Sequence, residues 1–180
     1  MLPWQLLTPD LVLSQSIAAI TPELMQEHGL RGMILDVDDT IVGNHESEAS
    51  PEIKVWIELM RQDYPIWLIS NNFSNRRIQN IAENLDLPFR SRAGKPSRRM
   101  VRQALEAMKL PPEQVAMIGD RLFTDTLVGN RLGLFTVLVQ PPCNNSDKGD
   151  NHKKTSLLRV RTNVLRRWEI WLARKSGVNI

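Results

Sequence analysis

Three carboxylates stand within four residues in the segment Asp36-Val37-Asp38-Asp39-Thr40, directly after the apolar run 33–35. Like charges this close repel one another, and carboxylates beside a hydrophobic core lose hydration. A divalent cation would offset both costs, and such clusters are typical of catalytic sites. We therefore expect the chemistry of this chain to centre on this pentapeptide.

Two other apolar runs also end in polar clusters. Residues 66–69 lead into Ser70-Asn71-Asn72, and residues 115–118 lead into Gly119-Asp120. Together with the run before Asp36, they predict buried strands over 32–36, 66–70 and 115–120, and a further strand is predicted over 134–139. Helices are predicted between these strands, over 22–28, 51–63, 74–84, 97–108 and from 121 to about 132, with Thr21, Ser50 and Ser74 as candidate N-caps.

The alternation of strands and helices predicts an α/β fold. We expect three α/β/α layers with a central parallel sheet covered on both faces. Ligands of such sheets bind beyond the carboxyl ends of the strands. Asp36, Ser70 and Asp120 should therefore converge on one edge of the sheet.

The composition indicates one core domain with flanking segments. Residues 1–30 are expected to be a helical segment packing on a core of residues 31–140, followed by a linker at 141–155 and a helix within 156–180. Cys143 is the only cysteine, so no intrachain disulfide can form, which fits a reducing compartment. No signal peptide or transmembrane helix is predicted, so the expected location is cytoplasmic.

Four sequence pieces together resemble the signature of the haloacid dehalogenase (HAD) superfamily of phosphotransferases. They are residues 36–40, residues 70–72, Gly94-Lys95-Pro96, and Gly119-Asp120 with Asp125. The resemblance covers roughly residues 30–140, and the pieces at 36–40, 70–72 and 119–120 stand where predicted strands end. It implies a Rossmann-like HAD fold and a Mg²⁺-dependent phosphatase that forms an aspartyl-phosphate.

The resemblance also implies a role for each residue. Asp36 would be the nucleophile, and Asp38 the general acid and base, a role for which crowding by Asp36 and Asp39 favours the protonated form. Ser70 and Lys95 would bind the transferring phosphoryl group. Mg²⁺ would be held by Asp36, the backbone carbonyl of Asp38, Asp120 and Asp125. Thr40 and Asn71 would assist substrate binding.

The spacing of the motifs leaves no room for a cap domain, because 34 residues separate Asp36 from Ser70 and 25 separate Ser70 from Lys95. A separate cap would need about 50 residues to form a core. We expect an open site with at most a short flap at 41–49, as in the capless subclass III. Within it the chain resembles the YqeG-type phosphatases, through residues 7–11, 20–24 and 94–96 and through the short loop to residues 70–72. Members of that family commonly have Asn where this chain has Asp39.

Positive charge is concentrated in the tail. Residues 152–180 carry eight Lys/Arg against Glu169, and because the whole chain carries +3, residues 1–151 carry −4. Apolar residues at helical spacing share one face of the predicted helix 156–175, which indicates either packing on the core or contact with an anionic membrane surface. A second basic cluster flanks Lys95 and could hold a second phosphate or be a solvated helix face; it comprises Arg90, Arg92, Arg98, Arg99 and Arg102.

Several substrates stay open. The YqeG-type group is related to phosphatases that convert phosphatidylglycerophosphate to phosphatidylglycerol, which suggests phosphatidylglycerophosphate as the substrate. The alternative is that the protein is a soluble phosphatase for sugar phosphates or nucleotides. A polynucleotide end-phosphatase ranks lower, because aromatic residues are not interleaved with the basic run at 90–102, so a nucleic-acid partner is not expected. A catalytically dead phosphate-binding module ranks lower too, since every catalytic position is filled. The sequence does not predict the oligomeric state.

Overall fold

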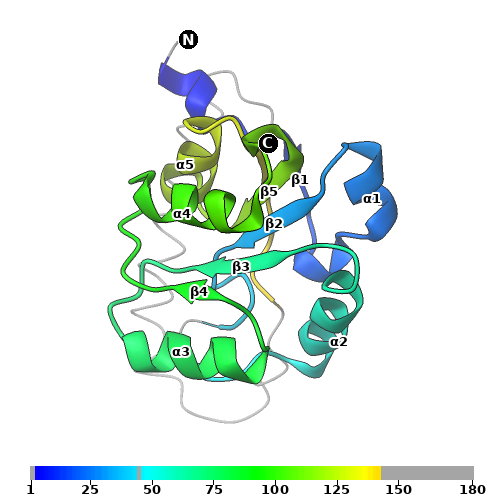
Figure 1. Ribbon diagram of the computed structural model, residues 1–180, viewed down its shortest axis with the longest axis vertical. Coiled ribbons are helices and arrows are strands. Elements are labelled where there is room, and N and C mark those ends of the chain that lie inside the picture. Colours follow the sequence, from blue (N-terminus) through cyan, green and yellow to red (C-terminus); the bar gives the residue numbers. More distant parts are fainter. Residues whose placement is uncertain (1–2, 44–45, 143–180) are drawn as a thin grey trace.

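A computed structural model describes residues 3–43 and 46–142. Six parallel strands form one sheet in the order β1-β6-β5-β2-β3-β4 (Figure 1). The strands are β1 (Leu11–Val12), β2 (Gly32–Leu35), β3 (Ile66–Ile69), β4 (Phe89–Arg90), β5 (Val115–Gly119) and β6 (Phe135–Leu138). The α-helices are α1 (Pro22–Glu27), α2 (Pro51–Met60), α3 (Asn75–Asn84), α4 (Arg99–Met108) and α5 (Leu127–Asn130).

The central strand β2 shows how the two faces of the sheet are filled. Its residues Met33 and Leu35 are fully buried in a cluster with the apolar side chains of α2 and α3. Ile34 is buried in a second cluster that includes α4 and Val128 of α5. Successive strand residues point to opposite faces, so one apolar run serves both layers. The predicted three-layer α/β/α fold with a parallel sheet is confirmed.

Two of the three predicted helix caps are confirmed. The side chains of Thr21 and Ser50 accept hydrogen bonds from the amides of Leu24 and Ile53, each at 3.3 Å. The prediction for Ser74 is wrong, because its side chain makes no capping bond to α3. Its amide instead donates to Asn72 Oδ1 at 2.8 Å, so Asn72 forms the turn before this helix.

The sheet contains two strands that the sequence did not indicate. β1 and β4 have two residues each, too few to show an alternating pattern, and they form the edges of the sheet. Three helix boundaries also differ from the prediction, and the first is the end of α2, at Met60 rather than at 63. α4 begins at Arg99 because Ser97 forms a turn with Gly94, and the chain after β5 passes through a π-helical turn, η4 (Leu122–Thr126), before α5.

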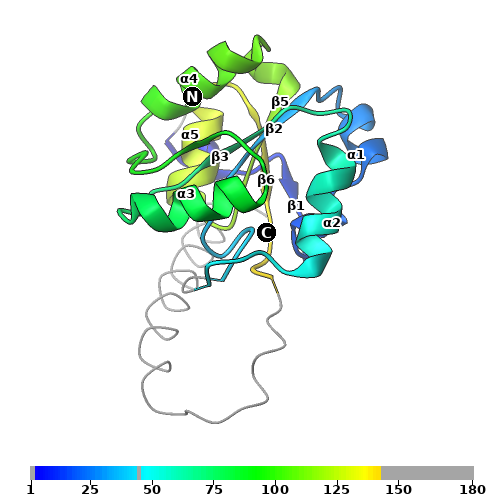
Figure 2. The same cartoon turned by 60° about the horizontal axis from the view of Figure 1, so that its bottom comes forward.

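The N-terminal segment lies against α2. A short 3-10 helix, η2 (Ile17–Ala19), and α1 contribute Ile17, Ile20 and Met25 to the core. Trp56 of α2 donates its indole N–H to the carbonyl of Ile20 at 2.7 Å. Figures 1 and 2 both show α1 beside α2.

The connection from β2 to β3 holds only one helix among its described residues, α2, and no cap domain. Ile41 and Val42 are buried in the core rather than extended over the site. The predicted linker beyond residue 142 and the predicted helix at 156–180 lie outside the described residues. Within the part of the chain that the structure describes, no helix is long and apolar enough to span a membrane.

Candidate active site

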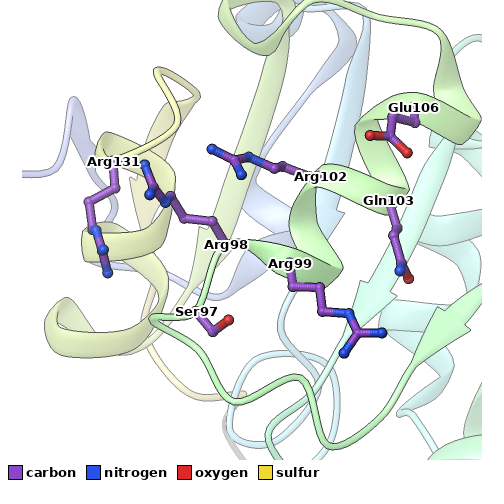
Figure 3. Close-up of a pocket in the computed structure, with 7 residues that line it drawn as sticks. All are labelled: Ser97, Arg98, Arg99, Arg102, Gln103, Glu106 and Arg131. Carbon is purple, nitrogen blue, oxygen red and sulfur yellow. The ribbon is translucent and has the colours of Figure 1, made fainter.

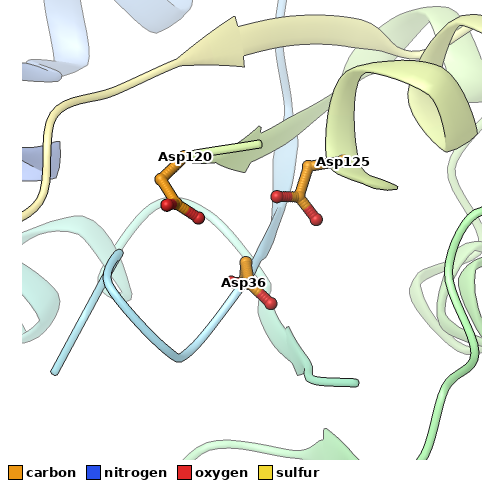
Figure 4. A group of neighbouring side chains, drawn as sticks. All are labelled: Asp36, Asp120 and Asp125. Atoms are coloured by element: carbon orange, nitrogen blue, oxygen red, sulfur yellow. The ribbon is translucent and has the colours of Figure 1, made fainter. Parts of the chain in front are cut away.

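The carboxyl ends of β2, β3 and β5 bring the polar clusters to one edge of the sheet, as their parallel pairing requires. A pocket of about 200 Å³ opens there. Its lining comprises Asp36, Asp38, Asn71, Asn72, Lys95, Arg121 and Thr124. Figure 4 shows the carboxylates of Asp36, Asp120 and Asp125 facing a common point from the ends of β2 and β5 and from η4.

Lys95 is the cationic centre of this pocket. Its side chain is 1% exposed, and its Nζ lies 2.6 Å from Asp36 Oδ1 and 2.7 Å from Asp125 Oδ1. Although burial alone would disfavour the charged amine, the carboxylates of Asp125 and Asp36 raise the pKa of Lys95. Lys95 therefore stays cationic and joins two buried carboxylates.

The backbone at Lys95 is fixed by Asn71. The Asn71 side chain accepts from the Lys95 amide at 2.7 Å and donates to the Lys95 carbonyl at 3.0 Å. Asn71 thus holds the segment that delivers the amine, and it also lines the pocket.

One cation does not balance the three acids. Burial raises the pKa of Asp36 to about 7 against the opposing effect of Lys95. Burial, together with the neighbouring Asp36 and Asp125, raises the pKa of Asp120 to about 8. Without further positive charge, both carboxyls would be substantially protonated near neutral pH.

The three aspartates could hold a metal ion. One oxygen from each of Asp36, Asp120 and Asp125 lies within 4.8 Å of the others, and all three residues are buried. Among the described residues, buried Asp120 Oδ1 has no hydrogen-bond partner, and its nearest ion-pair contact is Arg121 Nε at 3.9 Å. An all-carboxylate set with an unsatisfied oxygen suits a hard divalent cation such as Mg²⁺.

Gly119 makes room for Asp125. A Cβ at residue 119 would lie 2.3 Å from Asp125 Oδ2 and 2.6 Å from Asp125 Cβ. Both distances are far below van der Waals contact, so only glycine fits while Asp125 reaches Lys95.

Replacement of Gly119 by alanine should therefore displace Asp125. We expect Gly119→Ala to lower the free energy of unfolding by about 1–3 kcal/mol, as overpacking does, and to abolish stabilisation by Mg²⁺ in thermal unfolding. Gly133→Ala is the control: Gly133 has a φ of +78° but open space around it, so alanine there should cost stability and leave the Mg²⁺ response intact. An unchanged Mg²⁺ response in Gly119→Ala would contradict the assignment of Asp125.

The side chain of Asp38 lies apart from the three clustered aspartates. Its Oδ2 accepts from Ser70 Oγ at 3.2 Å and from Asn72 Nδ2 at 3.1 Å, and its Oδ1 accepts from Arg77 at 2.5 Å. Arg77 also donates to the carbonyls of Gly43, at 3.1 Å, and Glu46, at 2.9 Å. The side chain of Asp38 thus contacts a guanidinium and two neutral donors rather than the other acids of the pentapeptide.

Ser70, Thr40 and Asp39 differ in where they lie relative to the pocket. Ser70 is fully buried and bonded to Asp38, while Thr40 is fully buried and does not line the pocket. Asp39 has a left-handed backbone with a φ of +59°, and its amide donates to the Val42 carbonyl at 2.8 Å. Asn and Asp tolerate this conformation better than other residues with side chains, so the turn explains why an acid can replace Asn at this position.

Four residues of the site were not predicted: Asn72, Arg77, Arg121 and Thr124. Asn72 belongs to the recognised motif 70–72, and its position directly after Ser70 and Asn71 could have indicated that it lines the site. Arg77 lies on α3 beside Arg76, and nothing in the sequence distinguishes the half-buried Arg77 from the exposed Arg76. Arg121 is the N-cap residue of η4 and Thr124 lies within it, and only the packing defines the path of η4 around Gly119.

Comparisons with known proteins agree with this geometry. Residues 92–155 match the model of the HAD-hydrolase-like family. "Probable phosphatase YqeG" of Bacillus subtilis (strain 168) is 38% identical over 128 residues, which cover 71% of this chain and 74% of that protein.

Solved structures show the same fold. An uncharacterized protein from Listeria monocytogenes serotype 4b has a TM-score of 0.53 at 15% identity, covering 74% of this chain and 99% of its own. A HAD family enzyme from Bacteroides thetaiotaomicron, solved as a magnesium complex, has a TM-score of 0.51 at 10% identity, covering 66% of this chain and 97% of its own.

The parallel sheet, the absence of a cap domain from residues 3–43 and 46–142, the aspartate–lysine pocket and the similarity to known phosphatases define a capless phosphatase of the HAD superfamily. Within that superfamily, the chain belongs to the family of the YqeG-type phosphatases.

Proposed function

We propose that this protein is a Mg²⁺-dependent phosphatase that hydrolyses a phosphate monoester through an aspartyl-phosphate on Asp36. The contact between Lys95 Nζ and Asp36 Oδ1, at 2.6 Å inside the pocket, carries the proposal. The buried lysine opposes the effect of burial on the pKa of Asp36, and it offers positive charge to an arriving phosphate dianion. Phosphate monoesters react very slowly in water, so both effects are needed.

In the first step, an Asp36 carboxylate oxygen attacks phosphorus and the bond from phosphorus to the ester oxygen breaks. Asp38 gives its proton to the departing alkoxide, which leaves as an alcohol. In the second step, a water attacks the phosphorus of the acyl phosphate while Asp38 takes one of its protons. The bond to Asp36 then breaks, and inorganic phosphate leaves.

The contacts of Asp38 suit both duties. Ser70, Asn72 and Arg77 hold the carboxyl at the pocket lining, separated from the Lys95 cluster. The Ser70 hydroxyl is the donor that can exchange its bond to Asp38 for one to the phosphoryl group. Arg77 is a positioning residue, because it touches Asp38 and two backbone carbonyls and does not line the pocket.

Asp36, Asp120 and Asp125 would hold Mg²⁺, with the backbone carbonyl of Asp38 as a further ligand. When bound, the ion supplies positive charge to the carboxylates and to the phosphoryl oxygens. The magnesium complex of the Bacteroides thetaiotaomicron enzyme, which shares the fold, supports the choice of ion.

The raised pKa values of Asp36 and Asp120 predict how metal-free stability varies with pH. A carboxyl whose pKa is higher in the folded state than in the unfolded chain contributes stability at low pH and loses it as the pH rises through the folded pKa. We therefore expect the metal-free protein to lose stability as the pH rises from about 4 to 8. Mg²⁺ should restore it by several degrees of melting temperature at pH 8 and by much less at pH 5.5.

Thermal unfolding at both pH values, with chelator and with Mg²⁺, measures this effect. Asp120→Asn should flatten the pH profile and remove the response to Mg²⁺. Equal stabilisation by Mg²⁺ at the two pH values would contradict the assignment of the ligands.

For the substrate we propose phosphatidylglycerophosphate, acted on at a membrane surface by a cytoplasmic protein. The absence of a cap among the described residues supports access for a substrate embedded in a surface. The expected membrane contact through residues 156–175 lies outside the described residues. The second candidate, a soluble sugar-phosphate or nucleotide phosphatase, is favoured by the small volume of the pocket, about 200 Å³.

Phosphate release from phosphatidylglycerophosphate in vesicles, combined with vesicle flotation, tests the substrate. We expect release from the lipid to exceed release from soluble esters, and the full chain to float with anionic vesicles. Hydrolysis of soluble esters alone, without flotation, would exclude the lipid and leave the phosphatase assignment standing.

A further inference from the structure

A groove of about 540 Å³ beside the first turns of α4 is strongly basic. Four arginines line it, and Figure 3 shows their side chains around the hollow: Arg98, Arg99, Arg102 and Arg131. None of them lines the active-site pocket, so the groove is a separate site.

The charges of this groove are not balanced by the protein. Glu106 is the only acidic residue in the lining. Among the described residues, no hydrogen bond or ion pair engages the guanidinium groups of Arg98, Arg99 or Arg102. Clustered guanidinium groups without counter-charges repel one another, and an anion in the groove would relieve that repulsion.

The position of the arginines on α4 adds to the positive potential. Arg98 is the N-cap residue, Arg99 begins the helix, and the first turn contains no acidic residue. The helix dipole already places positive charge at this end, where acidic side chains are the favourable ones. Arginines here lower the stability of the isolated helix, while the same arrangement favours a bound anion.

Two walls of the groove are held in place. Arg131 donates to the Pro96 carbonyl at 3.0 Å. On the other side, Gln103 accepts from Arg90 Nε at 3.4 Å, and Arg90 lies over the Trp67 ring at 5.2 Å. The Gln103 amide and the Ser97 hydroxyl add neutral donors to the guanidinium groups. Two anchored side chains and three guanidinium groups unpaired within the described part of the chain, with one acidic residue among them, suit the oxygens of a phosphate group.

We propose that this groove is a second anion site that binds a phosphate group, independently of the active site. Its volume exceeds that of one phosphate ion, so it can take a phosphate joined to an organic headgroup. Free inorganic phosphate and the phosphate of a phospholipid headgroup share this chemistry. Ser97, which lines the groove, directly follows Lys95-Pro96 in the sequence. A bound phosphate would therefore contact the same segment that carries the active-site lysine.

Titration of the full chain with inorganic phosphate, followed by nuclear magnetic resonance, separates the two sites. We expect saturable shifts of the Arg102 Nε–H and the α4 amides, distinct from those of Lys95. Arg98→Gln/Arg102→Gln should weaken the α4 site by about tenfold or more, since each charge-assisted hydrogen bond contributes about that factor, and leave the Lys95 shifts unchanged. Arg31→Gln/Arg76→Gln, which removes two exposed arginines elsewhere, should change neither set.

Flotation with phosphatidylcholine vesicles, with and without phosphatidylglycerol, distinguishes the sources of phosphate. If the headgroup is the ligand, the Arg98→Gln/Arg102→Gln variant floats less with the anionic vesicles than the Arg31→Gln/Arg76→Gln variant does. If free phosphate is the ligand, the two variants float alike and only the phosphate titration distinguishes them. Linear, non-saturating α4 shifts that are the same in both variants would overturn the proposal and identify a solvated helix face.

Discussion

Asp36→Asn should reduce phosphate-ester hydrolysis by about ten-thousandfold or more, because removal of a nucleophile leaves only binding and electrostatic contributions. The amide cannot form the acyl phosphate, and it weakens the ion pair with Lys95 Nζ at 2.6 Å. Release of p-nitrophenol from p-nitrophenyl phosphate, with saturating Mg²⁺, measures the loss.

Asp39→Asn is the matched control for this substitution. Asp39 is in the same loop and has a left-handed backbone that Asn also adopts readily, so the variant should keep most of its activity. Comparable losses in the two variants would mean that the charge of the loop, rather than the position of Asp36, governs the reaction.

Lys95→Met should have the largest effect on stability at this site. The substitution leaves Asp36 and Asp125 buried without their cation, and loss of one partner from a buried ion pair costs about 3–5 kcal/mol. Turnover should fall by about a hundredfold to a thousandfold, the usual effect of removing one stabilising group from a transition state. Denaturant unfolding and steady-state kinetics measure the two effects separately.

A second substitution tests the reason for that loss. In Lys95→Met/Asp125→Asn, one of the two unpaired carboxylates is gone, so part of the stability should return while activity does not. Lys54→Met removes an exposed pair with Glu48 and should change stability little. Failure of the double variant to recover stability would show that Lys95 acts through packing rather than charge.

The sequence predicted the elements that carry long apolar runs. β2, β3, β5 and β6 lie within one or two residues of their predicted bounds, because a strand buried on both faces must be apolar throughout. The polar residues at the ends of these strands indicated Asp36, Ser70 and Asp120, and the resemblance to the HAD motifs added Asp38, Asn71, Lys95 and Asp125. The structure brings these residues to one edge of the sheet.

Other parts of the site depend on tertiary packing, which leaves no periodic signal. β1 and β4 are two residues long and exist through pairing with β6 and β3. Arg77 reaches Asp38 across 39 residues of chain, and its neighbour Arg76 is exposed. The Ser74 prediction was wrong because its side chain makes no capping bond to α3; the local turn is instead held by the bond from its amide to Asn72 Oδ1.

Trapping of the covalent intermediate tests the central claim most directly. Asp38→Asn should still be phosphorylated by p-nitrophenyl phosphate, whose leaving group needs no proton, but should lose the base that activates water. Acid quenching within one turnover, followed by peptide mass spectrometry, should find one phosphoryl group on Asp36, released by hydroxylamine. Turnover by the unmodified protein with no phosphorylated Asp36 in either form, or a phosphoryl group on another residue, would contradict the account.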